Sequence, residues 1–410
     1  MRPKSFMLIA GEASGDRLAA ELVTALRERV LERDAVSDPA PQPLRTALPP
    51  EFFGAGGPRM RAAGVELAFD LTRHSLIGLS GVLRKLLEFR RLFRRLFQLA
   101  VQRHPDVIVG VDFSGFNLRF AAAVRRHVRR RADWFHPWNP KLVQFVSPQV
   151  WASRPGRAFV LAENCDLLLS IIPFEAAWYA QRVPNLRVEF VGHPLVDRMA
   201  RLRTAPTETS APTTSPSGPG APRILLLPGS RMDEVRRHWP VLLQTLERLR
   251  HETPSLQART VLPDETLAAT VRALGTPPAV EIRVGEVLPA LLETDLAITK
   301  SGTVTLECAV AGVPAVVFYK TSWANYAIAK RLIHVKHLAM PNLLAGETLY
   351  PEFVQHTATP ENLARAALEL LRSETRRRAI KARLAGVVAS LGPPGANRRA
   401  AQAILNLLGT

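Results

Sequence analysis

Cysteine and long apolar runs are both scarce in this sequence. Its 410 residues contain two cysteines, Cys165 and Cys308. Two cysteines exclude a disulfide framework and a zinc site built on cysteine pairs, and they fit a reducing, cytosolic setting. The most apolar stretch, residues 304–318, contains Glu307 and Pro314 and is shorter than the roughly 18 residues of a membrane span. The apolar residues near the N-terminus are too few for a signal peptide, so we expect a cytoplasmic protein without a spanning helix.

Acidic residues are scarcer than basic ones: the sequence has 36 Asp and Glu and 54 Lys and Arg, which gives a formal net charge of +18. Such an excess indicates nucleic acid, an anionic membrane surface or a phosphorylated substrate as partner, or it reflects only an arginine-rich genome. No recognised nucleic-acid motif and no interleaving of basic and aromatic residues accompany the charge, so we expect no nucleic-acid partner. The G-x-G-x-x-G fingerprint is also missing after the first apolar run, which argues against an NAD-dependent dehydrogenase.

Short apolar runs alternate with amphipathic stretches along most of the chain. This alternation predicts an α/β protein with parallel sheets covered by helices. A first series of predicted strands covers residues 6–10, 106–111, 142–146, 167–171 and 188–191, and a second series covers 223–227, 279–284, 295–299 and 314–318. The two series indicate two Rossmann-like domains.

Composition marks the boundaries of these domains. Residues 204–222 consist largely of Pro, Ser, Thr, Gly and Ala, which is typical of a linker. A similar Pro-rich insertion, residues 37–50, comes after the first helix. We therefore expect a first domain at residues 1–200, a linker at 201–222, a second domain at 223–375 and C-terminal helices at 376–410.

A small-residue turn at residues 11–16, GEASGD, lies between the first predicted strand and a predicted helix at 17–27. A turn in this place is a usual ligand site in open α/β sheets, and its glycines permit close approach of a ligand. Ser14 and Asp16 are candidates for contact with a sugar hydroxyl, or they only cap the helix. The acidic side chains would repel a pyrophosphate, so this turn is not typical of a dinucleotide site.

Asp112 comes directly after the strand predicted at 106–111, at the sheet edge where ligands of open α/β sheets bind. A carboxylate there can accept a proton from a substrate hydroxyl, so Asp112 is our candidate general base and Glu12 is the second candidate. The alternative is an aspartate that only forms a turn with the Ser-Gly pair after it. Asn117, in the same motif, is a candidate contact to the acceptor.

Two further motifs of the first domain carry weaker signals. Trp151, with Arg154 and Arg157 shortly after it, can form the wall of a sugar or acyl pocket, or it serves only in packing. The Gly-rich residues 54–60 favour a plain turn. His193 lies near the expected domain junction, where we place it on the acceptor side of the site, although a single histidine is more often structural.

The second domain contains two predicted anion sites. Each combines the end of a predicted strand, small residues and the start of a helix, so that backbone N–H groups can bind phosphate. The candidate donor-site residues in these two motifs are Gly229, Ser230, Arg231, Ser301, Gly302, Thr303 and Glu307. Arg231 adds a bidentate phosphate donor, and Glu307 can accept hydrogen bonds from a ribose diol. Two such sites in one domain favour a nucleoside diphosphate as ligand.

Residues 76–97 form a predicted amphipathic helix with one apolar and one basic face. We assign membrane contact to six of its residues: Leu79, Val82, Leu83, Leu86, Arg90 and Arg91. Large apolar residues beside basic ones suit an anionic membrane surface. The alternative is a helix packed on the core with a solvated basic face.

The motifs, taken in order, resemble those of the bacterial lipid-A-disaccharide synthases. The blocks that carry the resemblance extend from residue 11 to residue 355: GEASGD, GAGGPRM, PDVIVGVDFSGFN, VSPQVWASR, PFE, FVGHPLVD, LPGSR, SGTVTLE, PNLLAGE and PEFVQ. The resemblance implies a two-domain GT-B glycosyltransferase with an interdomain cleft, without a tightly bound metal or other cofactor, at the inner face of the cytoplasmic membrane. It implies the substrates UDP-2,3-diacylglucosamine and 2,3-diacylglucosamine 1-phosphate, and as products a β-1,6-linked lipid A disaccharide 1-phosphate and UDP, with anomeric inversion.

The resemblance also implies roles for the candidate residues. The acceptor's 6-hydroxyl attacks the anomeric carbon, Asp112 takes its proton, and Arg231 with the turn at 301–303 stabilises the leaving diphosphate. Glu307 and Asn342 hold the nucleoside. The chain departs from the family where Ser114-Gly115 replaces a common Pro-Asp pair, where Gly81 replaces a Glu and where Ser153 replaces a Trp, which leaves the acyl-chain length open.

Other functions stay open on the sequence. The nearest is another UDP-sugar enzyme of the same fold, an N-acetylglucosaminyltransferase or a 2-epimerase, although the basic apolar helix favours a lipid substrate. A basic nucleic-acid-binding protein is the alternative outside the enzymes. The oligomeric state is also open, a homodimer included.

Overall fold

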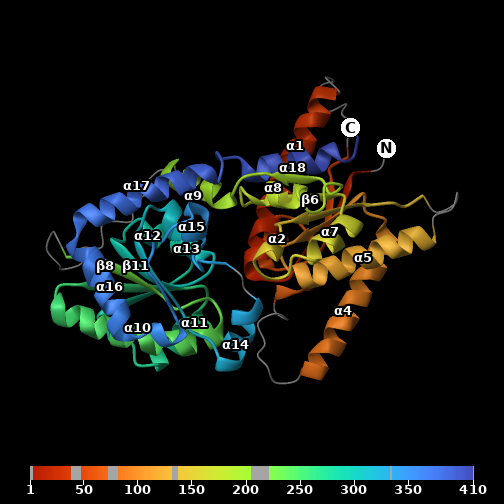
Figure 1. Ribbon diagram of the computed structural model, residues 1–410. Coiled ribbons are helices and arrows are strands. Elements are labelled where there is room, and N and C mark those ends of the chain that lie inside the picture. The colour runs from red at the N-terminus through yellow and green to blue at the C-terminus, as the bar shows by residue number, and fades with distance from the viewer. Residues whose placement is uncertain are drawn as a thin grey trace. The chain divides into compact units, whose positions relative to one another are not determined.

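The computed structural model describes residues 3–37, 48–72, 82–131, 137–204, 221–332 and 335–409 (Figure 1). The chain forms two compact units: Met1–Pro194 together with Gly392–Thr410, and Leu195–Leu391. We refer to them as the first and the second unit. The linker expected at 201–222 lies mostly outside the described residues. The first unit ends at Pro194, a few residues before the expected boundary at 200.

The described strands of the first unit form one parallel sheet in the order β3-β2-β1-β4-β5-β6-β7. Their bounds are β1 (Ser5–Ala10), β2 (Glu51–Gly56), β3 (Glu66–Asp70), β4 (Val107–Val111), β5 (Lys141–Phe145), β6 (Leu167–Ser170) and β7 (Val188–Phe190). All five strands predicted for this unit are present within one or two residues of the predicted bounds. The sequence predicted neither β2 nor β3.

The Gly-rich residues 54–60 are not a plain turn, and that prediction was wrong. They complete β2 and begin α2 (Pro58–Ala62). Gly54 has φ +148°, and a Cβ there would lie 2.0 Å from the carbonyl oxygen of Leu8 on β1. Glycine at this position is therefore required for β2 to pair closely with β1, so it indicates a strand under close approach.

Helices cover the sheet of the first unit, and the last helix of the chain is one of them. The helices are α1 (Ala13–Ser37), α2, α4 (Val82–Arg103), α5 (Ser114–Arg130), α6 (Val150–Ser153), α7 (Arg157–Asn164), α8 (Glu175–Ala180) and α18 (Ala396–Asn406), and α9 (Pro194–Thr204) leads into the second unit. Helix α18 crosses and packs against α1 (Figure 1), with Arg398 paired to Glu32 at 3.1 Å. The expected block of C-terminal helices at 376–410 is therefore divided: α17 (Glu374–Ser390) belongs to the second unit and α18 to the first.

The described strands of the second unit form a parallel sheet in the order β10-β9-β8-β11-β12-β13. Their bounds are β8 (Arg223–Leu227), β9 (Gln257–Leu262), β10 (Val280–Val284), β11 (Leu296–Lys300), β12 (Ala315–Tyr319) and β13 (Glu352–Val354). The helices are α10 (Met232–Glu252), α11 (Glu265–Ala273), α12 (Val287–Leu291), α13 (Val304–Val310), α14 (Trp323–Leu332), α15 (Met340–Ala345), α16 (Pro360–Arg372) and α17. The sequence missed β9, whose polar Gln257 and Arg259 interrupt the apolar pattern, and the three-residue β13.

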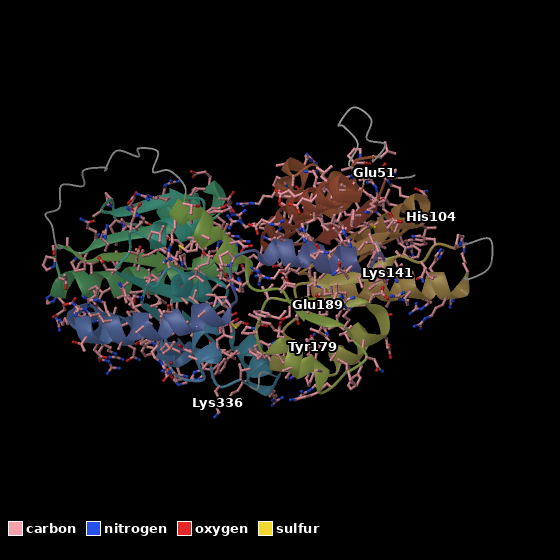
Figure 2. All side chains as sticks on the ribbon, turned by 90° about the horizontal axis from the view of Figure 1, so that it is seen from above. Glu51, His104, Lys141, Tyr179, Glu189 and Lys336 are labelled. Carbon is pink, nitrogen blue, oxygen red and sulfur yellow. The ribbon has the colours of Figure 1, made fainter. Side chains whose placement is uncertain are left out.

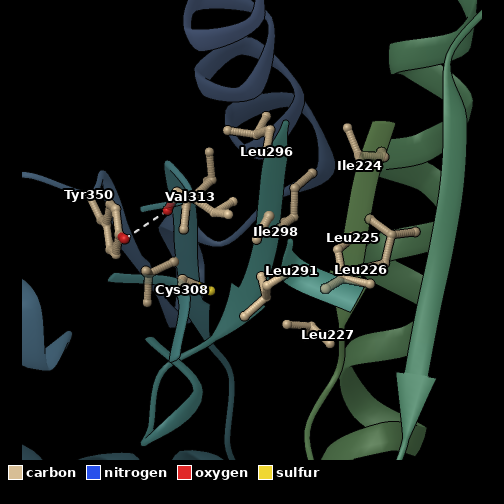
Figure 3. Packing of buried hydrophobic residues seen from close by; sticks show 14 of the residues in the cluster. Ile224, Leu225, Leu226, Leu227, Leu291, Leu296, Ile298, Cys308, Val313 and Tyr350 are labelled. Atoms are coloured by element: carbon tan, nitrogen blue, oxygen red, sulfur yellow. Dashed lines mark hydrogen bonds between the residues drawn. The ribbon is translucent and has the colours of Figure 1, made fainter. Parts of the chain in front are cut away.

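The core of the second unit lies between its sheet and its helices. Leu225, Leu226 and Ile298 from the two central strands are fully buried. Figure 3 shows them beside Cys308 of α13 and Tyr350, whose hydroxyl donates a hydrogen bond to the carbonyl oxygen of Val313 at 2.8 Å. Burial raises the pKa of the Cys308 thiol, which makes it an inert core residue.

Both sheets have the Rossmann strand order, which confirms the predicted fold class of two Rossmann-like units. The order reverses between β1 and β4 in the first unit and between β8 and β11 in the second. In open α/β sheets, ligands bind beyond the carboxyl ends of the strands at such a reversal. The motifs predicted to carry the chemistry come directly after these four strands.

Candidate active site

The first candidate site lies at the carboxyl ends of β1 and β4. A Cβ on Gly11 would lie 2.3 Å from a ring carbon of Phe113, so the turn after β1 needs glycine to accept this ring. A Cβ on Gly15 would lie 3.3 Å from the carbonyl oxygen of Val111 and 3.4 Å from Cβ of Asp112. The two small residues therefore let the first turn of α1 pack directly against Asp112.

Asp112 has a left-handed backbone, with φ 52°. This conformation costs a non-glycine residue about 1 kcal/mol or more, so the surroundings must hold it in place. Its N–H donates to Phe145 O at 2.7 Å, and its carbonyl oxygen accepts from Asn117 Nδ2 at 2.9 Å and from Gln144 Nε2 at 3.1 Å. Ser14 Oγ donates to Asp112 Oδ2 at 3.3 Å. The carboxylate is thus fixed at the sheet edge beside Ser14.

Two of the predicted acceptor contacts support the site from inside the protein. Asp16 is buried, and its carboxylate accepts the N–H groups of Gly57 at 2.7 Å, Arg59 at 3.0 Å and Met60 at 3.1 Å. It caps α2, whose own N-cap residue is a glycine without a side-chain acceptor. Asn117 is also buried, with its amide on the Asp112 carbonyl. We therefore assign both residues a structural role in place of acceptor contact.

Trp151 and His193 complete the predicted acceptor residues. Trp151 is half-buried, and its Nε1–H donates to Glu175 Oε1 at 2.9 Å while its ring packs edge-on against Phe174 at a centroid distance of 4.9 Å. His193 is buried and comes after Gly192, which has φ 83°.

Glu12, the second candidate base, is half-buried in the turn beside Ser14, where its carbonyl oxygen accepts the N–H of Asp16 at 2.8 Å.

The second candidate site lies at the carboxyl ends of β8 and β11. Gly229 has φ +129°, and a Cβ there would lie 2.4 Å from Glu234 Oε2. Glu234 accepts the N–H of Ser230 at 3.1 Å and pairs with Lys300 Nζ at 3.0 Å. Gly302 has φ +151° and leaves room for the Lys300 side chain. The Glu234–Lys300 ion pair therefore joins the two predicted anion loops.

The exposed and half-exposed residues of these loops fit an anion site. Arg231 is exposed at the N-cap of α10, and Thr303 is exposed at the N-cap of α13. Both positions lie where a helix presents free N–H groups. Ser301 is half-buried and donates its hydroxyl to Leu338 O at 3.0 Å, which fixes the turn. Glu307 is half-buried one turn into α13.

Asn342, predicted to hold the nucleoside, has all its printed hydrogen bonds within the protein. Its side chain is fully buried, and its Nδ2 donates to Tyr350 O at 2.7 Å and to Glu352 Oε1 at 2.8 Å. Its Oδ1 accepts the N–H groups of Leu349 at 3.0 Å and Tyr350 at 2.8 Å. Because both donors and the acceptor are used within the protein, we assign Asn342 to the support of the 346–352 loop and not to nucleoside contact.

His238 and Gln144 are site residues that the sequence analysis missed. The fully buried ring of His238 places Nδ1 2.6 Å from Pro228 O and Nε2 2.9 Å from Lys320 O, so it links the loops after β8 and β12. Burial lowers its pKa, with a smaller opposing effect of the backbone contacts. The sequence signal that could have revealed such residues is a polar residue within an apolar run. Gln144 is an example, at the fourth position of the strand Lys141–Phe145.

Helix α4 contains the residues predicted to contact a membrane. Leu79 lies outside the described residues, as do the side chains of Val82, Leu83 and Leu86. Arg90 and Arg91 are exposed.

The rest of α4 has both an exposed apolar residue, as membrane contact requires, and apolar residues packed in the core. Leu87 is 56% exposed, whereas Phe93 packs edge-on against Phe116 and Phe120 of α5 at centroid distances of 5.4 and 5.5 Å. The later turns of α4 therefore belong to the core. No helix among the described residues is long and apolar enough to cross a membrane, and these residues include no cluster of three or more His, Cys, Asp or Glu placed to hold a metal ion.

Comparison with known proteins decides the family. The family model described as lipid-A-disaccharide synthetase matches residues 6–406. The chain belongs to this family. The lipid-A-disaccharide synthase of Geobacter sulfurreducens is 35% identical over 407 residues, 98% of this chain and 97% of the relative. The enzyme of Chromohalobacter salexigens is 37% identical over 407 residues, 98% and 96% of the two chains.

Solved structures agree with the fold. The UDP-GlcNAc 2-epimerase of Neisseria meningitidis bound to UDP-GlcNAc has a TM-score of 0.60 at 11% identity, over 98% of this chain and 100% of that one. The calicheamicin glycosyltransferase CalG4 has a TM-score of 0.55 at 15% identity, over 100% and 99%. Family and fold together make this chain a glycosyltransferase of GT-B type, as the motifs predicted.

Proposed function

We propose that this enzyme condenses UDP-2,3-diacylglucosamine with 2,3-diacylglucosamine 1-phosphate to give lipid A disaccharide 1-phosphate and UDP. The observation that supports it most directly is the pairing of motifs with strand ends. The edge of the first sheet carries a fixed carboxylate, and the edge of the second carries two glycine-containing loops beside exposed helix N-termini. A glycosyl transfer from UDP needs a proton acceptor and a diphosphate site, and the two edges supply these two functions.

Asp112 is the proposed general base. It removes the proton of the acceptor's 6-hydroxyl as that oxygen attacks the anomeric carbon from the face opposite UDP, which inverts the anomeric configuration. Ser14, hydrogen-bonded to Asp112 Oδ2, orients the carboxylate. Base catalysis of this kind contributes about 10²–10⁴-fold. Glu12 is the second candidate, because it lies in the turn that packs against Asp112.

The second unit binds the donor in this proposal. Arg231 and the turn at 301–303 bind the diphosphate and stabilise the charge that develops as UDP leaves. The Glu234–Lys300 pair holds the two loops in register. Glu307 accepts hydrogen bonds from the ribose hydroxyls. We place the acyl-chain contacts with Trp151 in the first unit.

Peripheral membrane binding completes the proposal. Both substrates carry acyl chains, so the enzyme must take them from a bilayer surface. Exposed Leu87, Arg90 and Arg91 on α4 supply the apolar and basic side chains that such a surface binds.

One assay tests the function. The purified enzyme is incubated with both lipid substrates, and released UDP and the disaccharide are measured by coupled assay and mass spectrometry. We expect both products in equal amounts from the wild type and neither without the acceptor. Conversion of UDP-GlcNAc to its 2-epimer, or UDP release with a non-lipid acceptor only, would favour another UDP-sugar enzyme of this fold.

A further inference from the structure

Glu175 is a buried carboxyl group with no part in the proposed reaction. It begins α8, directly after the Pro-Phe pair of the PFE motif, and its side chain is completely shielded from solvent. Its Oε1 accepts the Trp151 Nε1–H at 2.9 Å, and its Oε2 lies 2.5 Å from Ser170 Oγ. Tyr179 of the same helix (Figure 2) shares a hydrogen bond of 3.2 Å with Ser147 next to this group. The cluster joins the ends of β5 and β6 to α6 and α8.

The hydrogen bonds around Glu175 can all be formed when its carboxyl group is protonated. Ser170 Oγ also donates to Ile172 O at 2.9 Å and accepts the Ile172 N–H at 3.2 Å. If Glu175 is protonated, its O–H donates to Ser170 Oγ, the Ser170 hydroxyl donates to Ile172 O, and Oε1 receives the indole N–H. Every group then has its partner. If Glu175 is ionised, the Ser170 hydroxyl must turn to the carboxylate, and Ile172 O keeps only the backbone N–H of Glu175 at 3.2 Å.

The electrostatic surroundings agree with the neutral form. Among the described residues no Lys, Arg or His forms an ion pair with Glu175, and a buried carboxylate without a cation is unfavourable. Burial raises the pKa of Glu175 to about 7, against smaller opposing effects of its hydrogen bonds. The titratable groups around it are Tyr179 and, beyond it, Cys165. Burial raises the pKa of Tyr179 above its usual range and that of Cys165 to about 12, so neither supplies charge near pH 7.

We propose that Glu175 is a positioning residue that acts as a neutral carboxylic acid and fixes the Trp151 indole for acceptor binding. Its Oε1 sets the direction of the indole N–H, and Phe174 packs edge-on against the ring. These two contacts hold the half-buried Trp151 side chain in place. The inference rests on the proposed function in one respect, the assignment of Trp151 to the acceptor. The neutral state of Glu175 does not depend on that assignment.

Three variants and one control test the role in catalysis. Glu175→Gln has the donor and acceptor of a protonated glutamic acid, Glu175→Leu has neither, and Trp151→Phe lacks the indole N–H. Glu163→Gln on α7 is the control, because Glu163 is exposed. We expect Glu175→Gln and the control to retain the acceptor KM within about twofold, and Glu175→Leu and Trp151→Phe each to raise it about tenfold with an unchanged donor KM. The double variant Glu175→Leu/Trp151→Phe should add little to either single change.

The failing outcomes are distinct. A Glu175→Gln variant as impaired as Glu175→Leu would show that an ionised carboxylate is needed and would overturn the proposal. An acceptor KM that is unchanged in Trp151→Phe would refute the link to the acceptor. If Glu175→Leu does not fold, Glu175→Gln and Trp151→Phe still decide both points. A wild type that consumes neither lipid substrate refutes the proposed function instead, and this result is seen before any variant is compared.

A stability measurement tests the neutral state without substrate. The folded pKa of about 7 exceeds the ordinary glutamate value of 4.5, so between these values the folded protein binds more protons than the unfolded one. The stability from this group is complete below pH 4.5 and is lost as the pH rises to about 7. The melting temperature of the wild type should therefore fall relative to Glu175→Gln over this interval, and Glu163→Gln should behave as the wild type does. Parallel curves for wild type and Glu175→Gln would overturn the proposal.

Discussion

The two sheets of this enzyme share a strand order and differ in the residues placed after their central strands. After β1 and β4 come Glu12 and Asp112, with Ser14 as the nearest hydroxyl donor. After β8 and β11 come glycines with positive φ, and the acidic Glu234 is neutralised by Lys300. In our proposal, the first edge accepts a proton and the second binds an anion. The comparison shows that topology places the site, whereas a few side chains beyond the strands set its chemistry.

The buried titratable groups extend this contrast. The first unit buries Glu175 behind Trp151, and the second buries His238 between the loops after β8 and β12. Burial raises the pKa of the acid and lowers the pKa of the base, because it disfavours the charged form of each. Burial thus favours the neutral form of each group, and the two groups change stability in opposite directions as the pH falls below 7.

Removal of the base at the first edge should have the largest effect. Asp112→Asn keeps the shape of the side chain and removes the proton acceptor, so we expect kcat to fall by at least about 10²-fold. UDP affinity, measured by calorimetry, should stay near the wild-type value because the donor loops are intact. Asp16→Asn, at the start of α1 beside the same site, is the comparison: it should lower the melting temperature through the α2 cap and leave kcat largely unchanged. A near-normal kcat in Asp112→Asn would move the role to Glu12.

Changes at the second edge should act on binding and not on proton transfer. Arg231→Ala and Glu307→Ala should each weaken UDP binding by about 10- to 100-fold, because a hydrogen bond to a charged group contributes about 1.5–3 kcal/mol. Arg236→Ala, an exposed arginine on the same helix, is the control and should bind UDP normally. Calorimetry that shows unchanged UDP affinity in both variants would place the nucleotide elsewhere and break the division between the two edges.

The alternation of apolar runs was enough to predict two parallel sheets, because buried parallel strands are nearly continuous apolar segments. It missed β2, in which glycines stand where apolar residues are expected, and β9, in which Arg259 pairs with Glu281 and Glu293 on the surface. These strands depend on neighbours that the local pattern does not reveal.

The sequence predicted the position of Asp112 and of the 229–231 loop directly after a strand, and the structure places both there, whereas their roles in the reaction stay proposals. The contacts of polar residues that turn inward were not predictable. Asp16, Asn117 and Asn342 have the composition of ligand contacts, and the structure uses them on backbone groups. Gln144, Glu175 and His238 sit among apolar residues, and only the three-dimensional arrangement shows their partners.

If the first unit binds the membrane through helix α4, changes in α4 should weaken vesicle binding and matched changes in the second unit should not. We expect the enzyme to sediment with anionic vesicles and salt to release it only partly, since attraction and insertion both contribute. Replacing Arg90 and Arg91 with Gln should weaken binding by about fivefold for each charge, at roughly 1 kcal/mol per residue. Arg236→Gln/Arg237→Gln, an exposed pair in the second unit, is the control.

The apolar part of the same helix decides between membrane and core. Replacement of Leu79, Val82, Leu83 and Leu86 by Ser should release the enzyme further from vesicles and leave UDP binding unchanged. Circular dichroism checks that the variant is folded. Loss of folding would instead identify these residues as core, as Phe93 is, and the membrane contact would have to lie elsewhere.

The smallest expected effect concerns the pH dependence that His238 gives the second unit. Burial lowers its folded pKa below the ordinary histidine value of 6.5, so below pH 6.5 the unfolded chain binds a proton that the folded unit does not. The stability from this group is therefore present above pH 6.5 and is lost as the pH falls. His238→Gln cannot titrate, and its melting temperature should drop less than that of the wild type between pH 7 and pH 5. His251→Gln on the same helix, where the histidine is exposed, should behave as the wild type does. Since Glu175 acts in the opposite direction, a wild-type curve that His238→Gln leaves unchanged while Glu175→Gln alters it would confine the pH response to the first unit.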